Sequence, residues 1–285
     1  MPYTVPYSFD RFYEAINLSG DHRAAANARK DWIVGRLSQS MDVLEARAIG
    51  SIPRYTALAG HADLDILVAL HYGRHIKGRE PAAVLAAVKG ALGTGAGAYR
   101  RNGQAVTVTF RSWPRVDVVP AARVVDDNGT VSHFEIPDMR RGIWIATNPG
   151  AHATRMREAA ADRGPGFRQA ITMVKHWNRR QDVRLQSYQV EVIALQTECT
   201  WDETGWSLVQ WFKAASTLTH WCWNGVSDAS GYLLHEQAGK AAVRLAESGS
   251  LASQAWARTY GKDDDHRGAI ALWRSLFGAQ FPAYG

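Results

Sequence analysis

The sequence predicts an α+β protein with two lobes: a mixed-sheet lobe with N-terminal helices over residues 1–145, and a helical lobe over residues 146–285. Between residues 42 and 147, short segments rich in Val and Ile alternate with Gly, Pro and Asn, a pattern typical of strands and turns. From Pro149 onward the apolar residues recur with the period of a helix instead. Because 46% of the 285 residues are hydrophobic, the chain can bury a sizeable core.

Local patterns predict each element in turn. Residues 8–41 carry helical periodicity on both sides of Gly20, which predicts two helices. Residues 81–92 predict one more helix, which interrupts the run of strands. The predicted strands are 42–50, 63–70, 105–110, 115–124, 130–136 and 142–147. The predicted helices of the second lobe are 166–181, 187–198, 206–223, 234–249 and 266–278.

Composition excludes several classes of protein. The formal net charge of +6 suits a polyanionic ligand such as a nucleoside triphosphate or nucleic acid, although many soluble proteins share such a charge. Cys199 and Cys222 are the only cysteines, which excludes a cysteine-based zinc ribbon. The sequence shows no signal peptide and no run of eighteen apolar residues, so we expect a cytoplasmic protein with no membrane partner.

Two aspartates interrupt an otherwise apolar strand. In "DLDILVAL", Asp63 and Asp65 lie on one face of the strand, where the carboxylates repel each other unless a cation lies between them. Asp117 stands in a later apolar strand, "RVDVVPA", where an unpaired buried carboxylate costs several kcal/mol, on the order of the stability of a marginal domain. A metal would remove that cost. The three aspartates are therefore candidate metal ligands and catalytic residues.

The donor set suggests which metal and which substrate. Mg²⁺ prefers oxygen ligands and keeps waters and substrate phosphates in its shell, so we expect two Mg²⁺ ions, with Mn²⁺ as the alternative, and nucleoside triphosphates as substrates. Two such ions can activate an attacking hydroxyl and stabilise a leaving pyrophosphate. A DxD motif alone is more often a solvated edge strand or a helix cap. The order of the whole set favours the catalytic interpretation.

A Gly-Ser pair precedes the aspartates. Gly50 at the end of a strand allows a tight turn and a close approach to a ligand, and Ser51 can donate to phosphate oxygens. Arg54 and Thr56 follow as further candidate phosphate contacts. Gly-Ser pairs are also common in ordinary turns, so this pair gains meaning only from the aspartates that follow it.

At these residues the sequence resembles the nucleotidyltransferases of DNA polymerase beta type. The matching residues are Ile49-Gly50-Ser51, then Asp63-Leu64-Asp65-Ile66, then Asp117. Within that superfamily, "GSIPRYTALAGHADLDILV" most resembles the bacterial cGAS/DncV-like nucleotidyltransferases, the CD-NTases of CBASS antiphage signalling. The stretches "VKHWNRR", "QSYQVEVIAL" and "LWRSLFGAQFP" resemble helical-lobe signatures of the SMODS subgroup, so the resemblance covers nearly the whole chain.

The resemblance implies a fold and further site residues. It implies a polymerase-beta-type palm with a mixed sheet and a C-terminal helical lobe, with the nucleotide cleft between the lobes. It also implies that Lys175 and Ser187 hold phosphates of the donor nucleotide and that Tyr188 stacks on a base, an interaction worth about 1–3 kcal/mol. The alternatives are a solvated helix lysine, and an N-cap serine beside a core tyrosine.

The resemblance further implies a function. The chain would be a template-independent enzyme that makes a cyclic dinucleotide or trinucleotide from nucleoside triphosphates, and the product would activate a separate effector protein. We expect a monomer. We also expect no obligatory DNA, because the chain lacks the zinc ribbon that the animal relatives use to bind DNA. The alternatives are a nucleotidyltransferase that modifies tRNA, a protein or a small molecule, and an inactive nucleotide- or RNA-binding module.

Three other features favour structural interpretations. His71 and His75 follow a strand, which favours a surface turn over a metal site. The acidic cluster "KDDDH" at 262–266 stands at a predicted helix start and favours capping. The tryptophans of the second lobe, including Trp201, Trp206, Trp211, Trp221 and Trp223, favour core packing or a partner surface.

Overall fold

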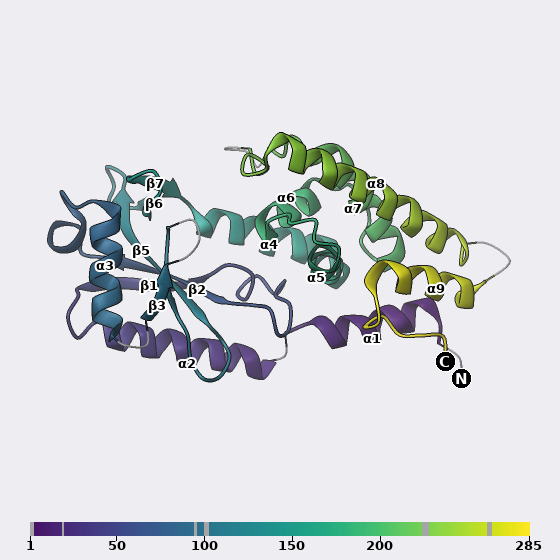
Figure 1. The fold of residues 1–285 in the computed structure, drawn as a ribbon, viewed down its shortest axis with the longest axis horizontal. Helices are drawn as coiled ribbons and strands as arrows, with labels where there is room; N and C mark the ends of the chain where they lie inside the picture. The colour runs from purple at the N-terminus through teal and green to yellow at the C-terminus, as the bar shows by residue number, and fades with distance from the viewer. Residues whose placement is uncertain (1–2, 19, 94–95, 100–102, 224–227, 261–263) are drawn as a thin grey trace. The chain divides into compact units, whose positions relative to one another are not determined.

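The computed structural model describes residues 3–18, 20–93, 96–99, 103–223, 228–260 and 264–285 (Figure 1). The chain forms two compact units. The sheet unit consists of Leu18–Tyr55 and Gly60–Thr154, and the helical unit consists of Met1–Asn17, Thr56–Ala59 and Arg155–Gly285.

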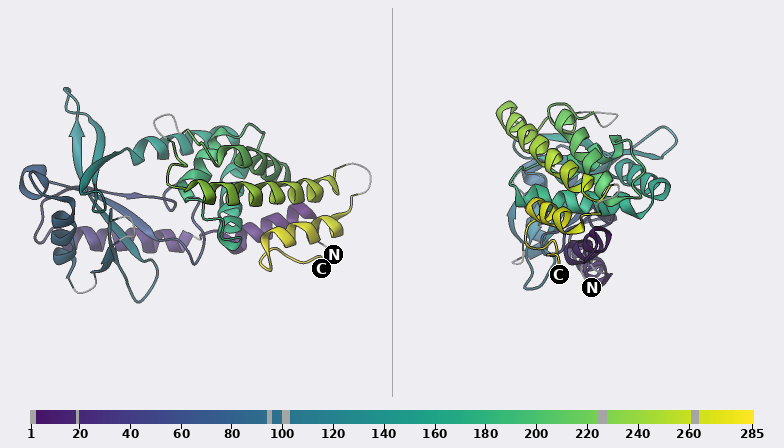
Figure 2. Two further views of the ribbon diagram at one scale, coloured as in Figure 1. Left: turned by 45° about the horizontal axis from the view of Figure 1, so that its top comes forward. Right: turned by 90° about the vertical axis from the view of Figure 1, so that its right-hand side faces the viewer.

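The two units differ from the two lobes expected from the sequence, which assigned the N-terminal helix to the sheet lobe. Helix α1 (Val5–Ile16) is part of the helical unit, not of the sheet unit. Its Phe9 ring lies 5.0 Å from the ring of Trp273, and its Phe12 ring lies 4.8 Å from that of Phe277. These aromatic contacts explain the grouping, and periodicity within α1 does not reveal them. Helices α1 and α9 (His266–Phe277) accordingly lie side by side in Figure 2.

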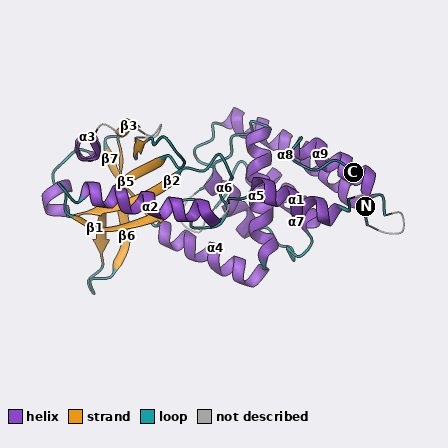
Figure 3. Ribbon diagram, turned by 90° about the horizontal axis from the view of Figure 1, so that it is seen from below, coloured by secondary structure: helices purple, strands orange, loops and turns teal. Residues whose placement is uncertain are grey.

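The sheet unit contains a seven-stranded mixed sheet, whose strands are orange in Figure 3. The strand order is β1-β2-β5-β4-β3, and β6 pairs with both β5 and β7. Strands β2 and β5 are parallel, while the other paired strands are antiparallel. The bounds are β1 Val43–Ile49, β2 Leu64–Leu70, β3 Ala96–Tyr99, β4 Val106–Val108, β5 Val116–Val125, β6 Val131–Asp138 and β7 Ile143–Thr147.

Burial explains why β2 and β5 are central. In β2 every residue except Asp65 is buried, and the first seven residues of β5 are buried as well. Continuous apolar runs of this kind are typical of strands covered on both faces. The six strands expected from the sequence are confirmed, and β3 is an additional strand that the sequence did not indicate.

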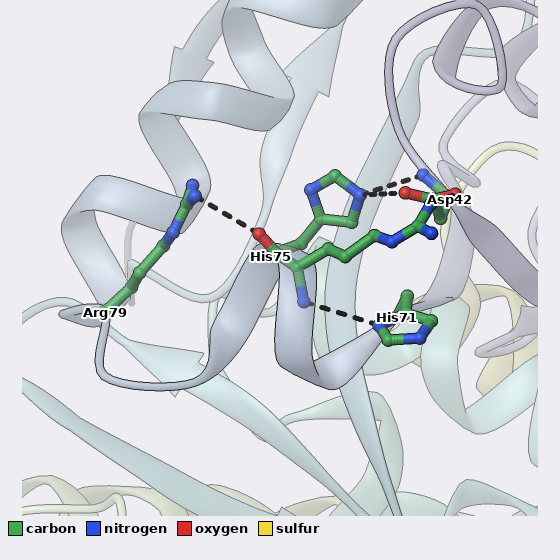
Figure 4. A network of polar contacts seen from close by, with 5 residues as sticks. Asp42, His71, His75 and Arg79 are labelled. Atoms are coloured by element: carbon green, nitrogen blue, oxygen red, sulfur yellow. Dashed lines mark hydrogen bonds and ion pairs between the residues drawn. The ribbon is translucent and has the colours of Figure 1, made fainter.

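Helices α2 (Gly20–Leu37) and α3 (Pro81–Leu92) and a short π-helix, η1 (Tyr72–Ile76), accompany the sheet. The turn expected at His71 and His75 is this π-helix. The His75 Nε2 atom lies 2.9 Å from Asp42 Oδ2 (Figure 4). The Arg74 guanidinium lies 2.7 Å from Asp42 Oδ1. These contacts join η1 to the residue that precedes β1.

Helix α4 (Pro149–Arg163) contains the division between the units, and the helices that follow it in the sequence belong to the helical unit. They are α5 Pro165–Arg180, α6 Ser187–Gln196, α7 Thr204–Leu218, α8 His235–Ala257 and α9. Trp201 and Trp211 are fully buried in the core of the helical unit, as expected. Trp221 and Trp223 are exposed and stack on each other. No helix within the described ranges combines the length and apolar character needed to cross a bilayer.

Asp265 caps α9 by accepting a hydrogen bond from the Gly268 N–H, which confirms the capping role expected for the acidic cluster. Residues 262 and 263 of that cluster lie outside the described residues.

Candidate active site

Strand register places the three aspartates on one face of the sheet unit. In the parallel pair β2–β5, Leu64 is opposite Val116 and Asp65 is opposite Asp117. Asp63 directly precedes β2, and side chains alternate along a strand, so Asp63, Asp65 and Asp117 share a face. Two neighbouring parallel strands therefore present three carboxylates together, as the motif predicts.

Asp63 is held by an arginine that sequence reasoning did not single out. The Arg115 Nε donates to Asp63 Oδ1 at 3.1 Å, and a terminal Arg115 nitrogen donates to Asp63 Oδ2 at 2.5 Å. The hydrogen bond to Asp63 and then the charge of Asp63 raise the pKa of Arg115; burial opposes this shift, and the charge of Asp117 adds a smaller increase. The face that Asp63, Asp65 and Asp117 share, called the acidic face below, therefore also carries the positive charge of Arg115, which contacts both oxygens of Asp63.

Asp117 is the most deeply buried of the three, with 4% of its surface exposed. Thr107 lies opposite it in the antiparallel pair β4–β5, and the Thr107 hydroxyl donates to Asp117 Oδ1 at 2.5 Å. A hydrogen bond to the charged form stabilises a buried carboxylate. Thr107 therefore orients Asp117 from the neighbouring strand.

Gly50 makes room for Asp65. The last residue of β1, Ile49, is paired with Asp65, and Gly50 follows with a left-handed φ of +80°. A Cβ atom at Gly50 would overlap Asp65 Oδ2 and lie 3.1 Å from Asp65 Cγ. Glycine is thus required here for its backbone conformation and for the space that the carboxylate occupies.

The donor set fits divalent metal ions in chemistry and in register. Carboxylate oxygens are the ligands that Mg²⁺ prefers, and three of them share one face. As the side chains are placed, no cluster of three or more His, Cys, Asp or Glu residues in the described part of the chain is arranged to hold a metal ion. Asp63 turns both oxygens to Arg115, so a divalent ion at Asp63 would compete with the guanidinium for these oxygens.

The predicted phosphate contacts Ser51 and Arg54 also belong to the sheet unit. They lie in the turns that follow Gly50, and both side chains are half-buried. The Tyr55 N–H donates to Ile52 O at 3.1 Å and closes one of these turns. Ser51 and Arg54 are thus presented by a compact loop at the end of β1.

Thr56 and Lys175 are buried within the helical unit. The Lys175 ammonium donates to Thr56 Oγ1 at 2.8 Å and to Thr56 O at 3.1 Å, and it forms a 2.7 Å ion pair with Glu191 Oε1. The Thr56 hydroxyl in turn donates to the same Glu191 oxygen at 2.7 Å. Lys175 is 5% exposed and the other two side chains are fully buried. The alternative of a solvated helix lysine is therefore wrong.

Ser187 and Tyr188 stand at the start of α6 in the helical unit. Ser187 is exposed, and Tyr188 is half-buried against the core. The N-cap residue of α6 is Gln186, not Ser187, and its N–H donates to the Tyr232 hydroxyl at 2.6 Å. Burial raises the pKa of Tyr232, so its hydroxyl stays neutral and donates to Gln189. Tyr232 thereby fixes the helix end that carries Ser187.

The structure brings the predicted residues together in two groups. Gly50, Ser51, Arg54 and the aspartates belong to the sheet unit, and Thr56, Lys175, Ser187 and Tyr188 belong to the helical unit. Sequence reasoning missed Arg115, Thr107 and Glu191. Arg115 had a usable signal, because it stands two residues before Asp117 and hence on the same strand face.

Known proteins match almost the whole chain. A family model described as Second Messenger Oligonucleotide or Dinucleotide Synthetase domain matches residues 3–159. A probable cyclic nucleotide synthase of Bacillus cereus (strain VD146) is 22% identical in an alignment 330 positions long, which covers 99% of this chain and 98% of that protein.

Solved structures match as well. The structure of CdnC from E. coli MS115-1 with ATP has a TM-score of 0.76 at 16% identity, covering 97% of this chain and 98% of that chain. The CD-NTase CdnG of Bradyrhizobium diazoefficiens in complex with GTP has a TM-score of 0.72 at 13% identity, covering 95% of this chain and 97% of that chain. These matches confirm the expected fold, a polymerase-beta-type palm with a helical lobe.

Proposed function

Because the chain belongs to the Second Messenger Oligonucleotide or Dinucleotide Synthetase family, we propose that it joins nucleoside triphosphates, without a template, into a cyclic dinucleotide or trinucleotide. In each step a ribose hydroxyl oxygen attacks the α-phosphorus of a triphosphate, the hydroxyl proton is lost, and pyrophosphate leaves. The observation that carries this proposal is the register of β2 and β5, which places Asp63, Asp65 and Asp117 on one face.

In this proposal the carboxylates of the sheet unit do the chemistry. Asp63, Asp65 and Asp117 would hold two Mg²⁺ ions, or Mn²⁺, which when bound activate the attacking hydroxyl and offset the charge of the leaving pyrophosphate. Thr107 keeps Asp117 in place, and Gly50 leaves the space that Asp65 occupies. These two residues would act by positioning the carboxylates.

The remaining predicted residues would bind the nucleotide. Ser51 and Arg54 would donate to phosphate oxygens from the loop after β1. In the helical unit Ser187 is exposed and available as a donor, and Tyr188 would stack on a base. The Lys175 ammonium would reach a phosphate only by giving up one of its contacts with Thr56 or Glu191. We propose that these two partners hold it ready at that position.

The biological setting follows from the same family. The product would activate a separate effector protein in antiphage defence, and the enzyme would work in the cytoplasm as a monomer that needs no DNA. ATP and GTP are the first substrates to test, because the similar CdnC and CdnG structures contain ATP and GTP, respectively.

Mass spectrometry of the products tests the proposal. The purified chain would be incubated with the four ribonucleoside triphosphates and Mg²⁺, without nucleic acid, and the products treated with phosphatase. We expect small products that resist phosphatase, because a closed ring has no terminal phosphate.

Asp65→Asn supplies the control. It should make no product, yet its melting temperature should hold or rise, because it relieves repulsion among the carboxylates. Linear, phosphatase-sensitive chains or labelled tRNA would refute cyclisation. Full activity of Asp65→Asn would refute the site.

A further inference from the structure

Arg115 and Asp63 form the most complete ion pair on the acidic face. They directly precede the parallel strands β5 and β2, and the Leu64 N–H donates to Arg115 O at 2.9 Å, which places the two residues side by side. The Arg115 guanidinium contacts both oxygens of Asp63. Paired forks of this kind are among the stronger ion contacts in proteins.

Both side chains can leave this contact. The Arg115 side chain is 54% exposed and that of Asp63 is 32% exposed, so neither is held in place by close packing. Arg115 also shares a strand face with Asp117, two residues on. Its positive charge therefore lies on the face that the three carboxylates share, where it would repel a divalent ion.

We propose that Arg115 is a placeholder cation, which neutralises Asp63 in the metal-free protein and competes with a divalent ion for the Asp63 oxygens. The inference rests on the metal role proposed above for Asp63. Arg115 would have two opposite effects: it stabilises the metal-free sheet unit, where three carboxylates share one face, and it weakens metal binding by competing for Asp63 and by repelling the ion.

Direct measurement of Mn²⁺ binding tests the placeholder. Mn²⁺ would be titrated into the wild-type chain, Arg115→Gln, Arg115→Lys and Arg74→Gln, without nucleotide, and free Mn²⁺ followed by electron paramagnetic resonance. Because a partly exposed pair contributes modestly, we expect Arg115→Gln to bind Mn²⁺ about three- to tenfold more tightly than wild type. Arg115→Lys keeps the charge but cannot form the fork, so its gain should be smaller.

Arg74→Gln is the matched control. It removes the same charge from another exposed Arg–Asp pair of the sheet unit, the pair of Arg74 with Asp42, which directly precedes β1. Val43 pairs with Leu70, so this pair lies toward the opposite end of β2 from Asp63. We expect wild-type Mn²⁺ affinity in this variant.

The melting temperature is the second readout. Without metal, Arg115→Gln should melt below wild type, and saturating Mn²⁺ should raise its melting temperature by more than it raises that of wild type. Equal or weaker Mn²⁺ binding by Arg115→Gln would overturn the inference while leaving the proposed function intact. If neither protein bound Mn²⁺, the metal role of Asp63 would fail, and the placeholder with it. Product formation, measured separately, distinguishes the two failures.

Discussion

The buried pair between Lys175 and Glu191 gives the sharpest prediction about stability. Its atoms lie 2.7 Å apart, and the two side chains are 5% and 0% exposed. Lys175→Met would leave the Glu191 carboxylate in the core without its cation. Removing one partner of a buried pair costs about 3–5 kcal/mol, a large share of the stability of a typical domain. Glu191→Gln should cost a similar amount, because it leaves the ammonium buried.

The double variant Lys175→Met/Glu191→Gln is expected to recover most of this loss. It buries no charge, and the glutamine oxygen still accepts from the Thr56 hydroxyl, which lies 2.7 Å from Oε1 in the present structure. Replacing a buried pair by neutral groups of similar size is often close to neutral. The sum of the losses in unfolding free energy of the two single variants should therefore exceed the loss of the double variant by about 3 kcal/mol or more. This difference is the coupling energy of the pair.

Urea unfolding of the four proteins, followed by circular dichroism, measures this cycle. Lys240→Met is the control, because Lys240 forms an exposed pair with Glu236 and should leave the midpoint unchanged. A cost below about 1 kcal/mol for Lys175→Met, or additive single costs, would refute the reasoning. The double variant also isolates the proposed nucleotide role: its stability should return, but the melting shift on adding ATP and Mg²⁺ should be smaller than in wild type.

Two further predictions concern the sheet unit. Gly50→Ala should displace the Asp65 carboxylate and lower the rate of product formation by about 100-fold. Gly35→Ala is the control, because a Cβ atom there meets no atom within 4 Å, and its rate should equal that of wild type. Equal rates for the two variants would contradict the steric argument. The hydrogen bond with His75 lowers the pKa of Asp42, so Asp42 stabilises the protein above its ordinary pKa, and this contribution is lost as the pH falls through the lowered value. In Asp42→Asn the melting temperature should therefore fall less steeply than in wild type as the pH is lowered below about 4. The same pH dependence of the melting temperature in both proteins would contradict this.

Much of the fold could be predicted because its signals are local. The strands β2 and β5 are unbroken apolar runs, and the motif from Gly50 to Asp117 has an order that few other folds produce. Strand β3, whose sequence is "AGAY", escaped prediction because it has no β-branched residue and two of its four residues are alanine. Resemblance to a known family supplied the second messenger synthetase assignment, which the family match confirms.

The rest depends on contacts between distant residues. Nothing in the pattern around Lys175 shows that its ammonium is buried against Glu191, because only the packing of α5 and α6 brings these residues together. The apolar face of α1 likewise does not show which core the helix packs against, because that depends on its contacts with distant residues of the helical unit. Arg115 was visible in the sequence as a neighbour of Asp117, but its pairing with Asp63 depends on the strand register.

The parallel pairing of β2 with β5 also has a consequence for folding. Asp63 and Arg115 are 52 residues apart in the chain, whereas Thr107 and Asp117 are 10 apart. Closing the longer loop costs about 1.5 kcal/mol more in chain entropy, so β5 is expected to pair with β4 before it pairs with β2. The third carboxylate therefore joins the other two only when most of the sheet is already in place. A chain still being synthesised, or cut short before residue 117, cannot assemble this face and has no complete set of carboxylates with which to capture a metal.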